Sequence, residues 1–296
     1  MQQDQDIDAD HALEGLLRKA LIKAHLSDED TETEFARLVA EIKLPDHVYE
    51  HPRLKQAVRL PQRVLGLEDA TGGVVWNSST FLVDYLLTAP EAADMIVGRS
   101  VLELGAGAGL PSIAAALLGA SRVTLTDGDA SACETAAANV ALNRVEVRVV
   151  RLLWGRGSDT EVAALQKSAA ASTIVASDVL YDEDSIDRLE ETLRAFIGLG
   201  VRRVILGWRW RGHGEETFFE RLRDLGTART VRRVTGSEKR DKGVTVFSVH
   251  ESVFSVHESQ GCGSTAPSMR GRAVAALLVT AAAVAVLLAA ARASRK

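Results

Sequence analysis

A glycine-rich turn beside an acidic residue is the stretch best suited to chemistry. Glycines stand at Gly105, Gly107 and Gly109, after an apolar run that contains Glu103 and before an alanine- and leucine-rich stretch that opens at Pro111. The apolar run predicts a buried strand, and proline is well tolerated in the first turn of a helix. Strand, glycine turn and helix begin a nucleotide-binding βαβ unit, in which glycines let the backbone approach the ligand.

The spacing of the glycines narrows the choice of nucleotide. A dinucleotide fingerprint needs G-x-G-x-x-G, and its last position would fall on Leu110 counted from Gly105, or on Ser112 counted from Gly107. The fingerprint therefore fails, and the sequence favours a different nucleoside ligand. The alternative is a glycine turn that binds nothing.

Two further acids stand where predicted strands end. Asp127 closes the run Arg-Val-Thr-Leu-Thr-Asp, where a βαβ unit places a carboxylate for the ribose hydroxyls. Asp178 follows the run that starts at Thr173, and Tyr181 comes three residues later. Ligands of open α/β sheets lie at the carboxyl ends of strands, and a carboxylate there suits a cationic group such as a lysine ammonium. The alternatives are an exposed turn aspartate for Asp127 and a helix cap for Asp178.

Aromatic residues accompany these acids. Trp76 precedes an apolar helix expected at 81–87, and Trp154 follows Leu153 at the exit of a predicted strand. Each tryptophan could line a ligand pocket or pack in the core. The run 208–213, Trp-Arg-Trp-Arg-Gly-His, could equally line a substrate entrance or form a solvated loop with one packed ring.

Residues 60–252 resemble the family-16 seven-strand protein-lysine methyltransferases, which use S-adenosylmethionine (SAM). The resemblance is carried by Glu-Leu-Gly-Ala-Gly-Ala-Gly at 103–109, Gly-Val-Val-Trp at 73–76, Thr-Asp at 126–127 and Asp-Val-Leu-Tyr at 178–181. It implies an α/β, Rossmann-like sheet of class I methyltransferases, transfer of a methyl group to a lysine of a protein substrate, and Asp178 and Tyr181 as catalytic residues. The cofactor-binding residues that it implies are Trp76, Glu103, Gly105, Ala106, Gly107, Gly109, Asp127, Trp154 and Ser177.

Two features bear on alternative functions. Enzymes that methylate adenine or glutamine amides carry Asn-Pro-Pro-Tyr, whereas this chain has Asp178 and no proline in that segment. The family usually has an acid where this chain has Leu153. This departure from the family's pattern bears on cofactor binding. A small-molecule SAM methyltransferase and a non-catalytic, membrane-tethered SAM-binding module stay open as alternatives, because a fold alone does not choose between them.

Composition limits the partners. The net charge of −5 shows no basic surplus, so nucleic acid is not expected as a partner. Two cysteines cannot form a disulfide framework and suit a reducing compartment. No group of metal-ligating residues stands out, and we expect a monomer.

Hydrophobic periodicity predicts the remaining elements. Helices are expected at 11–26 and 31–44, within an N-terminal helical extension of residues 1–59, and further along at 111–118, 130–143, 182–199 and 215–225. Strands are expected at 64–67, 74–76, 101–104, 122–127, 145–149, 173–178 and 201–207, and a closing β-hairpin is expected at 228–234 and 244–249.

The C-terminal part is unlike the rest. Residues 246–252 are repeated as 253–259, and a linker follows to residue 272. Residues 273–291 carry no charge and would span about 28 Å as a helix, close to the hydrocarbon core of a bilayer. We expect a transmembrane tail anchor that holds the enzyme on the cytoplasmic face of an intracellular membrane, either the mitochondrial outer membrane or the endoplasmic reticulum.

Overall fold

The computed structural model describes residues 44–63 and 72–249, apart from residues 156, 158, 182, 212, 213 and 235–241, together with the isolated positions 19, 22, 23 and 38. The helices expected at 11–26 and 31–44, the strand expected at 64–67, the repeated segment, the linker and the segment 273–291 lie outside this description. Within the part of the chain that the structure describes, no helix combines the length and the apolar character that a membrane span needs.

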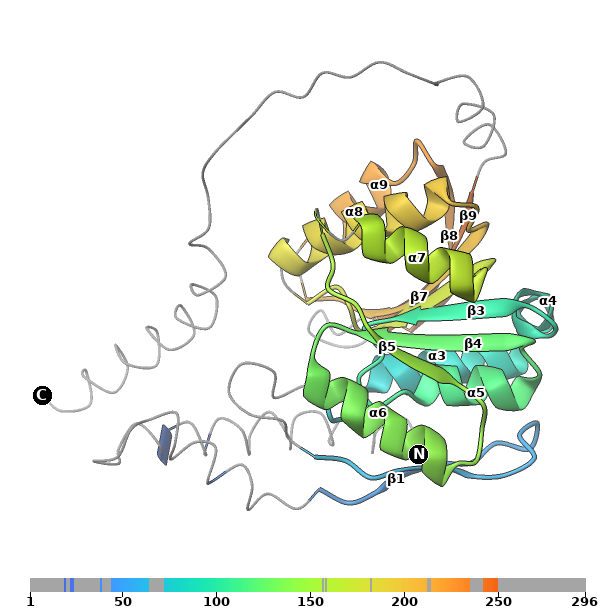
Figure 1. Cartoon of the computed structure of the whole chain (residues 1–296), viewed down its shortest axis with the longest axis vertical. Helices are drawn as coiled ribbons and strands as arrows, with labels where there is room; N and C mark the ends of the chain where they lie inside the picture. The colour runs from blue at the N-terminus through green and yellow to red at the C-terminus, as the bar shows by residue number, and fades with distance from the viewer. Residues whose placement is uncertain are drawn as a thin grey trace, which may run out of the picture. The chain divides into compact units, whose positions relative to one another are not determined.

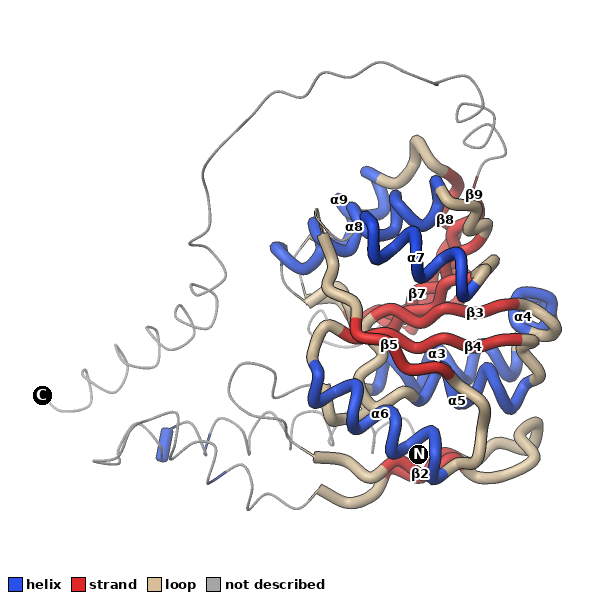
Figure 2. The backbone as a smooth tube through the Cα atoms, viewed as in Figure 1, coloured by secondary structure: helices blue, strands red, loops and turns tan. Residues whose placement is uncertain are grey.

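A seven-stranded sheet forms the centre of the fold, in the order β5-β4-β3-β6-β7-β9-β8 (Figures 1 and 2). Its strands are β3 Ser100–Leu104, β4 Arg122–Asp127, β5 Arg148–Arg151, β6 Thr173–Ser177, β7 Arg203–Arg209, β8 Gly226–Val234 and β9 Lys242–Val249. Strands β3 to β7 pair in parallel, whereas β9 pairs antiparallel with both β7 and β8. This confirms the Rossmann-like seven-strand sheet and the closing hairpin predicted from the sequence.

Helices cover both faces of the sheet, since alternate residues of a strand point to opposite sides. The helices are α3 Asn77–Thr88, α4 Pro90–Ile96, α5 Leu110–Leu118, α6 Ala130–Leu142, α7 Asp159–Ala169, α8 Glu183–Gly198 and α9 Glu215–Arg221. On one face Leu102, Ile174 and Val204 pack with residues of α7, α8 and α9. On the other, Val101 and Val175 pack with residues of α3, α4 and α5. Figure 1 shows these two layers on opposite sides of the sheet.

Strand order determines where a ligand can bind. Strand β3 lies between β4 and β6, so the chain leaves β3 in one direction to form β4 and later crosses back to form β6. The carboxyl ends of these neighbouring parallel strands meet at one edge of the sheet. In open α/β sheets, ligands bind outside that edge at the point where the strand order reverses.

The segment before α3 differs from prediction. Residues 74–76 form no strand, and the prediction of one there is wrong. Instead, Gly73 O accepts a hydrogen bond from Arg63 N at 3.0 Å, and Val75 N donates to the side-chain oxygen of Gln62 at 2.8 Å. The backbone groups are satisfied by a loop and a side chain, so no strand ladder is needed.

Three boundaries also differ. Helix α3 begins at Asn77, with Trp76 as its N-cap, four residues before the start expected at residue 81. Strand β5 was expected to begin at residue 145 but begins at Arg148, which is the first of its residues to pair with β4. Trp208 and Arg209 belong to β7, paired with β9, rather than to the loop after it.

A short hairpin precedes the sheet, in a region for which the sequence indicated only helices. Its strands are β1 His47–Tyr49 and β2 Val58–Leu60. Both side chains at the ends of β2 are fully buried. Asn143, just after α6, accepts from Arg59 N at 2.9 Å and donates to Arg59 O at 2.7 Å, which ties the hairpin to the core.

Candidate functional site

The turn between β3 and α5 requires glycine. Gly105, Gly107 and Gly109 have φ angles of 63°, 51° and 87°, a left-handed region that disfavours residues with a Cβ. Space is equally restrictive, because a Cβ on Gly105 would come within 2.8 Å of Val179 and 2.9 Å of the Trp154 ring. The backbone of the turn therefore lies directly against the tryptophan predicted to contact the cofactor.

Glu103 lies beneath this turn, at the end of β3. Its Oε2 accepts a hydrogen bond from Ser112 N at 2.9 Å, in the first turn of α5. Gly109, the N-cap of α5, has no side chain to satisfy the free amides of the helix, so Glu103 takes over that role. Complete burial raises the pKa of Glu103 to about 8, against the opposing effect of the Ser112 contacts.

Asp127 joins the end of β4 to the glycine turn. Its Oδ2 accepts from Gly107 N at 2.9 Å, and its Oδ1 accepts from Asp129 N at 3.0 Å. Burial raises the pKa of Asp127, while these amide contacts lower it. Each carboxylate oxygen keeps a further lone pair, so the group can still accept hydrogen bonds from a ligand diol.

Asn139 supports the turn from α6. Its side-chain amide donates to Ala108 O at 2.9 Å, and the residue is buried. Ala106 N donates to Thr126 O at 3.0 Å, so the turn is also attached to β4 by its backbone. The sequence offered one weak sign of Asn139, a lone amide among the alanines of a predicted helix.

Asp178, at the end of β6, is held by both its backbone and its side chain. It has a φ angle of 59°, unusual for a residue with a side chain, and its N–H donates to Gly207 O at 2.9 Å. Its Oδ1 accepts from Arg211 Nη1 at 2.6 Å, and only 6% of its side chain is exposed. Tyr181, by contrast, is 48% exposed. The carboxylate is thus fixed and the tyrosine lies at the surface.

Ser177 connects the end of β6 to α3. Its hydroxyl lies 2.7 Å from the hydroxyl of Ser79, and both residues are buried. Trp76, the partly buried N-cap of α3, stands three residues before Ser79. The first turn of α3 therefore adjoins the same edge of the sheet as Asp178.

Trp154 combines packing with an exposed part. Its ring packs against the core that α7 and α8 form with the sheet, yet the residue is only partly buried. Within the described residues its indole N–H is buried and has no hydrogen-bond partner. The neighbouring Leu153 is 57% exposed and lies beside Gly128, which follows β4. A polar ligand group at this place would satisfy the indole N–H.

The structure brings most of the predicted site residues into one place. Gly107 contacts Asp127, and Gly105 lies against both Trp154 and the residue that follows Asp178. These contacts join the carboxyl ends of β3, β4 and β6, as the sequence predicted. Sequence reasoning left the role of the 208–213 run open, and the structure places Arg211 of that run on Asp178.

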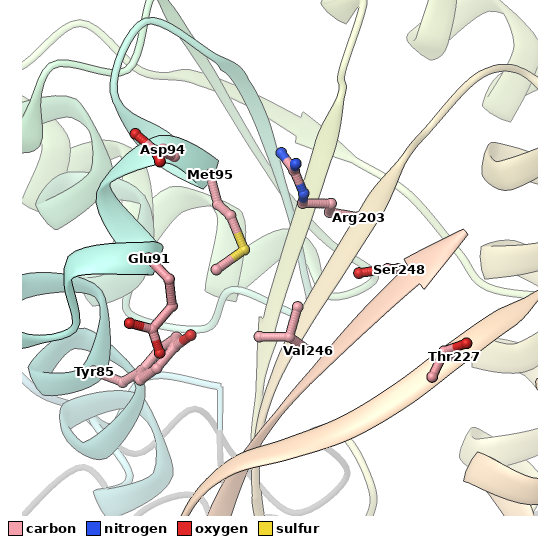
Figure 3. Close-up of a pocket in the computed structure, with 8 residues that line it drawn as sticks. All are labelled: Tyr85, Glu91, Asp94, Met95, Arg203, Thr227, Val246 and Ser248. Carbon is pink, nitrogen blue, oxygen red and sulfur yellow. The ribbon is translucent and has the colours of Figure 1, made fainter. Parts of the chain in front are cut away.

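A cavity of about 380 Å³ lies elsewhere, beside the amino end of β7 (Figure 3). It is lined by Tyr85, Glu91, Asp94, Met95, Arg203, Thr227, Val246 and Ser248. None of the predicted site residues lines it. Across the described residues, no cluster of three or more His, Cys, Asp or Glu side chains is arranged to hold a metal ion.

Parts of the chain resemble known proteins. A yeast enzyme of Cryptococcus neoformans, "Protein N-terminal and lysine N-methyltransferase EFM7", is 33% identical over 139 residues, which cover 45% of this chain and 46% of that protein. "Protein N-lysine methyltransferase METTL21A" of Danio rerio is 35% identical over 163 residues, which cover 53% of this chain and 70% of that protein. The human "Electron transfer flavoprotein beta subunit lysine methyltransferase" is 31% identical, over 47% of this chain and 49% of that protein.

The match to the Cryptococcus enzyme spans about half of that enzyme's length. The model of the family described as "Lysine methyltransferase" matches residues 61–225, from just after β2 to the start of the closing hairpin. That stretch is more than half of the chain and contains the glycine turn, Asp127, Trp154 and Asp178. The chain belongs to the lysine methyltransferase family.

Proposed function

We propose that the chain transfers a methyl group from SAM to a lysine side chain of a protein. The observation that carries this proposal is the carboxylate of Asp178, which lies at the end of β6, almost fully buried and already paired with a cationic side chain. A fixed carboxylate at this edge can accept a hydrogen bond from the amine of a lysine side chain and orient it. The names of the family and of the relatives support the same reaction class.

The residues at the sheet edge fit SAM. The glycine turn has no Cβ atoms where the backbone must approach a nucleoside, and Asp127 can accept from the ribose hydroxyls. The indole N–H of Trp154, which has no partner among the described residues, adds a donor for a polar ligand group. When bound, SAM supplies a methyl group already activated by its sulfonium.

The protein has to place and deprotonate the amine. A lysine ammonium has a pKa near ~10.4 in water, and transfer into a desolvated site lowers it by disfavouring the charged form. Asp178 would orient the nitrogen, and Tyr181, half exposed three residues later, would shape the entrance. Positioning a lone pair in line with an activated carbon accounts for a large part of such catalysis, so no strict general base is required.

The decisive experiment removes the carboxylate. Purified wild type and Asp178→Ala are incubated with radiolabelled SAM and with lysate from cells that lack the gene, and the products are resolved by gel and by small-molecule extraction. We expect a labelled protein band with wild type, no band with Asp178→Ala, and unchanged SAM affinity by calorimetry. Asp94→Ala, on α4 and exposed, is the matched control and should retain the band.

The other outcomes identify the alternatives. Label found only in the small-molecule extract would indicate a small-molecule methyltransferase. SAM binding with no labelled product of either kind would indicate a binding module. A full rate in Asp178→Ala would show that the role given to that residue is wrong.

We also propose that residues 273–291 anchor the enzyme to the cytoplasmic face of an intracellular membrane. The uncharged stretch and the basic residues on both sides of it support this proposal. Carbonate extraction of membranes should leave the full chain in the pellet and release a version truncated after residue 272. Release of both would contradict the proposal.

A further inference from the structure

An arginine forms an ion pair with the carboxylate of the proposed catalytic centre. Arg211, two residues after β7, donates from Nη1 to Asp178 Oδ1 at 2.6 Å. The Asp178 side chain is almost fully buried, and 23% of the Arg211 side chain is exposed. An ion pair shielded to this degree is screened little by water or salt. The net charge of the pair therefore influences the protonation of a group that binds beside it.

Both partners are held in place by the fold. Arg211 N donates to the carboxylate of Glu215 at 2.6 Å, and Glu215 is the first residue of α9 and only 1% exposed. The backbone of Asp178 is bonded to Gly207 in β7. The pair thus links the ends of two neighbouring strands, and it is part of the architecture of the site rather than a chance surface contact.

An unpaired carboxylate would create a chemical difficulty for methyl transfer. The substrate nitrogen needs a free lone pair, so it must first give its proton to water. A negative charge within about 4–6 Å favours the protonated form of an amine and raises its pKa. Asp178 alone would therefore bind lysine readily but hold it as the unreactive ammonium.

We propose that Arg211 is a positioning residue that balances the charge of Asp178, so that the substrate lysine binds as a neutral amine. This inference rests on the proposed function. With the pair intact, Asp178 can accept a hydrogen bond from the amine without strongly favouring the ammonium. The nitrogen then bonds the methyl carbon while the sulfur–carbon bond breaks, and the positive charge passes from sulfur to nitrogen.

Other titratable groups stand close to the pair along the chain. Among the described residues, Tyr181 follows β6, Arg209 ends β7, and Glu215 and Glu216 begin α9. The carboxyl group of Glu215 accepts a hydrogen bond from the backbone N–H of Arg211. The direction of the effect does not depend on Glu215, because loss of the arginine adds one net negative charge near Asp178 whether or not Glu215 is ionised.

The test is the dependence of kcat on pH for Arg211→Gln and Arg211→Lys. The substrate is the protein band that wild type labels in the lysate experiment, purified and used at saturation between pH 6.5 and 10. For Arg211→Gln we expect the apparent pKa of the rising limb to move up by about one unit or more. The rate near pH 7 would then fall about tenfold and recover at alkaline pH. Arg211→Lys keeps the charge and should keep the limb where wild type has it.

Controls separate this effect from a loss of structure. Arg223→Gln removes an arginine whose side chain is 74% exposed, and it should leave the profile unchanged. Melting temperature and SAM affinity report folding, and Arg211→Met serves as the uncharged variant if Arg211→Gln does not fold.

An unshifted pH profile of Arg211→Gln would overturn the inference, and it could take two forms. A fall in rate by the same factor at every pH would indicate a structural role. A lower KM with an unshifted profile would indicate that Arg211 only blocks the substrate. If wild type transferred no methyl group at any pH, the proposed function itself would fail. A normal wild-type rate with an unshifted Arg211→Gln profile would overturn this inference alone.

Discussion

The amide of Gly107 donates to Asp127 Oδ2 over 2.9 Å. The turn after β3 and the acid at the end of β4 therefore form a single unit, although 20 positions separate them in the sequence. A substitution of either residue should therefore shift the position of the other. It should also change the affinity for a nucleoside bound at this edge.

Asp127→Asn should weaken SAM binding. One oxygen of the carboxylate faces Gly107 N and the other faces Asp129 N, so the amide group of asparagine must present its own donor to one of them. Asparagine also keeps only one oxygen that can accept from the ribose hydroxyls, and a ligand hydrogen bond lost from a charged acceptor is worth about 1.5–3 kcal/mol, which corresponds to roughly a ten- to hundredfold lower affinity. Calorimetric titration with SAM measures this change.

Asp129→Asn is the matched control for that experiment. Asp129 caps α6 by accepting from Ser131 N at 2.8 Å, and asparagine caps helices about as well as aspartate. Its SAM affinity should stay at the wild-type value. Equal losses in both variants would show that Asp127 has no special part in binding.

Gly105→Ala should lower the free energy of unfolding and the affinity for SAM more than Gly98→Ala does. Both glycines have positive φ, 63° and 68°, so both substitutions carry the same backbone penalty of about 1–2 kcal/mol. A Cβ at Gly98 meets nothing within 4 Å, whereas one at Gly105 meets Val179 and Trp154 below 3 Å. Denaturant unfolding and SAM titration of the two variants give the comparison, and indistinguishable losses would contradict the close approach at Gly105.

Glu103→Gln should become more stable relative to wild type as the pH rises. The pKa of Glu103 is raised from its ordinary 4.5 to about 8 by burial, so between these values the folded state keeps a proton that the unfolded state has released. The contribution of Glu103 to stability is therefore fully present below pH 4.5 and is lost as the pH rises towards 8. Glutamine cannot ionise and avoids this loss.

The measurement for Glu103 is the difference in melting temperature between variant and wild type at pH 5 and pH 8. Other titrating groups are common to both proteins and cancel in the difference. We expect the difference to move by several degrees in favour of the variant, given the usual relation between free energy and melting temperature. A difference that stays constant with pH would show that Glu103 ionises normally in the folded protein.

Sequence reasoning succeeded where a strand is buried on both faces. The runs that became β3, β4 and β6 are buried along most of their length, and Glu103, Asp127 and Ser177 stand at or next to their carboxyl ends. Glycine spacing, strand ends and the resemblance were enough to place Asp127 and Asp178 together. The reason is that parallel strands align their carboxyl ends wherever the loops go.

It failed where long-range contacts decide the structure. The strands of the first hairpin have three residues each, and the backbone of Arg59 in β2 bonds to the side chain of Asn143, more than 80 positions later. The missing strand at 74–76 follows from a side-chain acceptor on Gln62. In the sequence, Arg211 is one of several cationic residues in the run 208–213. It lies against Asp178 because β7 pairs with β6 in the sheet.

The position of β9 has a consequence for the nascent chain. It is the last of the seven strands to leave the ribosome, yet it lies between β7 and β8. Until it is synthesised, β7 presents an open edge, and β8 has no neighbour in the sheet. Unpaired edges of this kind invite aggregation, so the protein depends on rapid insertion of one late strand, or on a chaperone, to emerge intact.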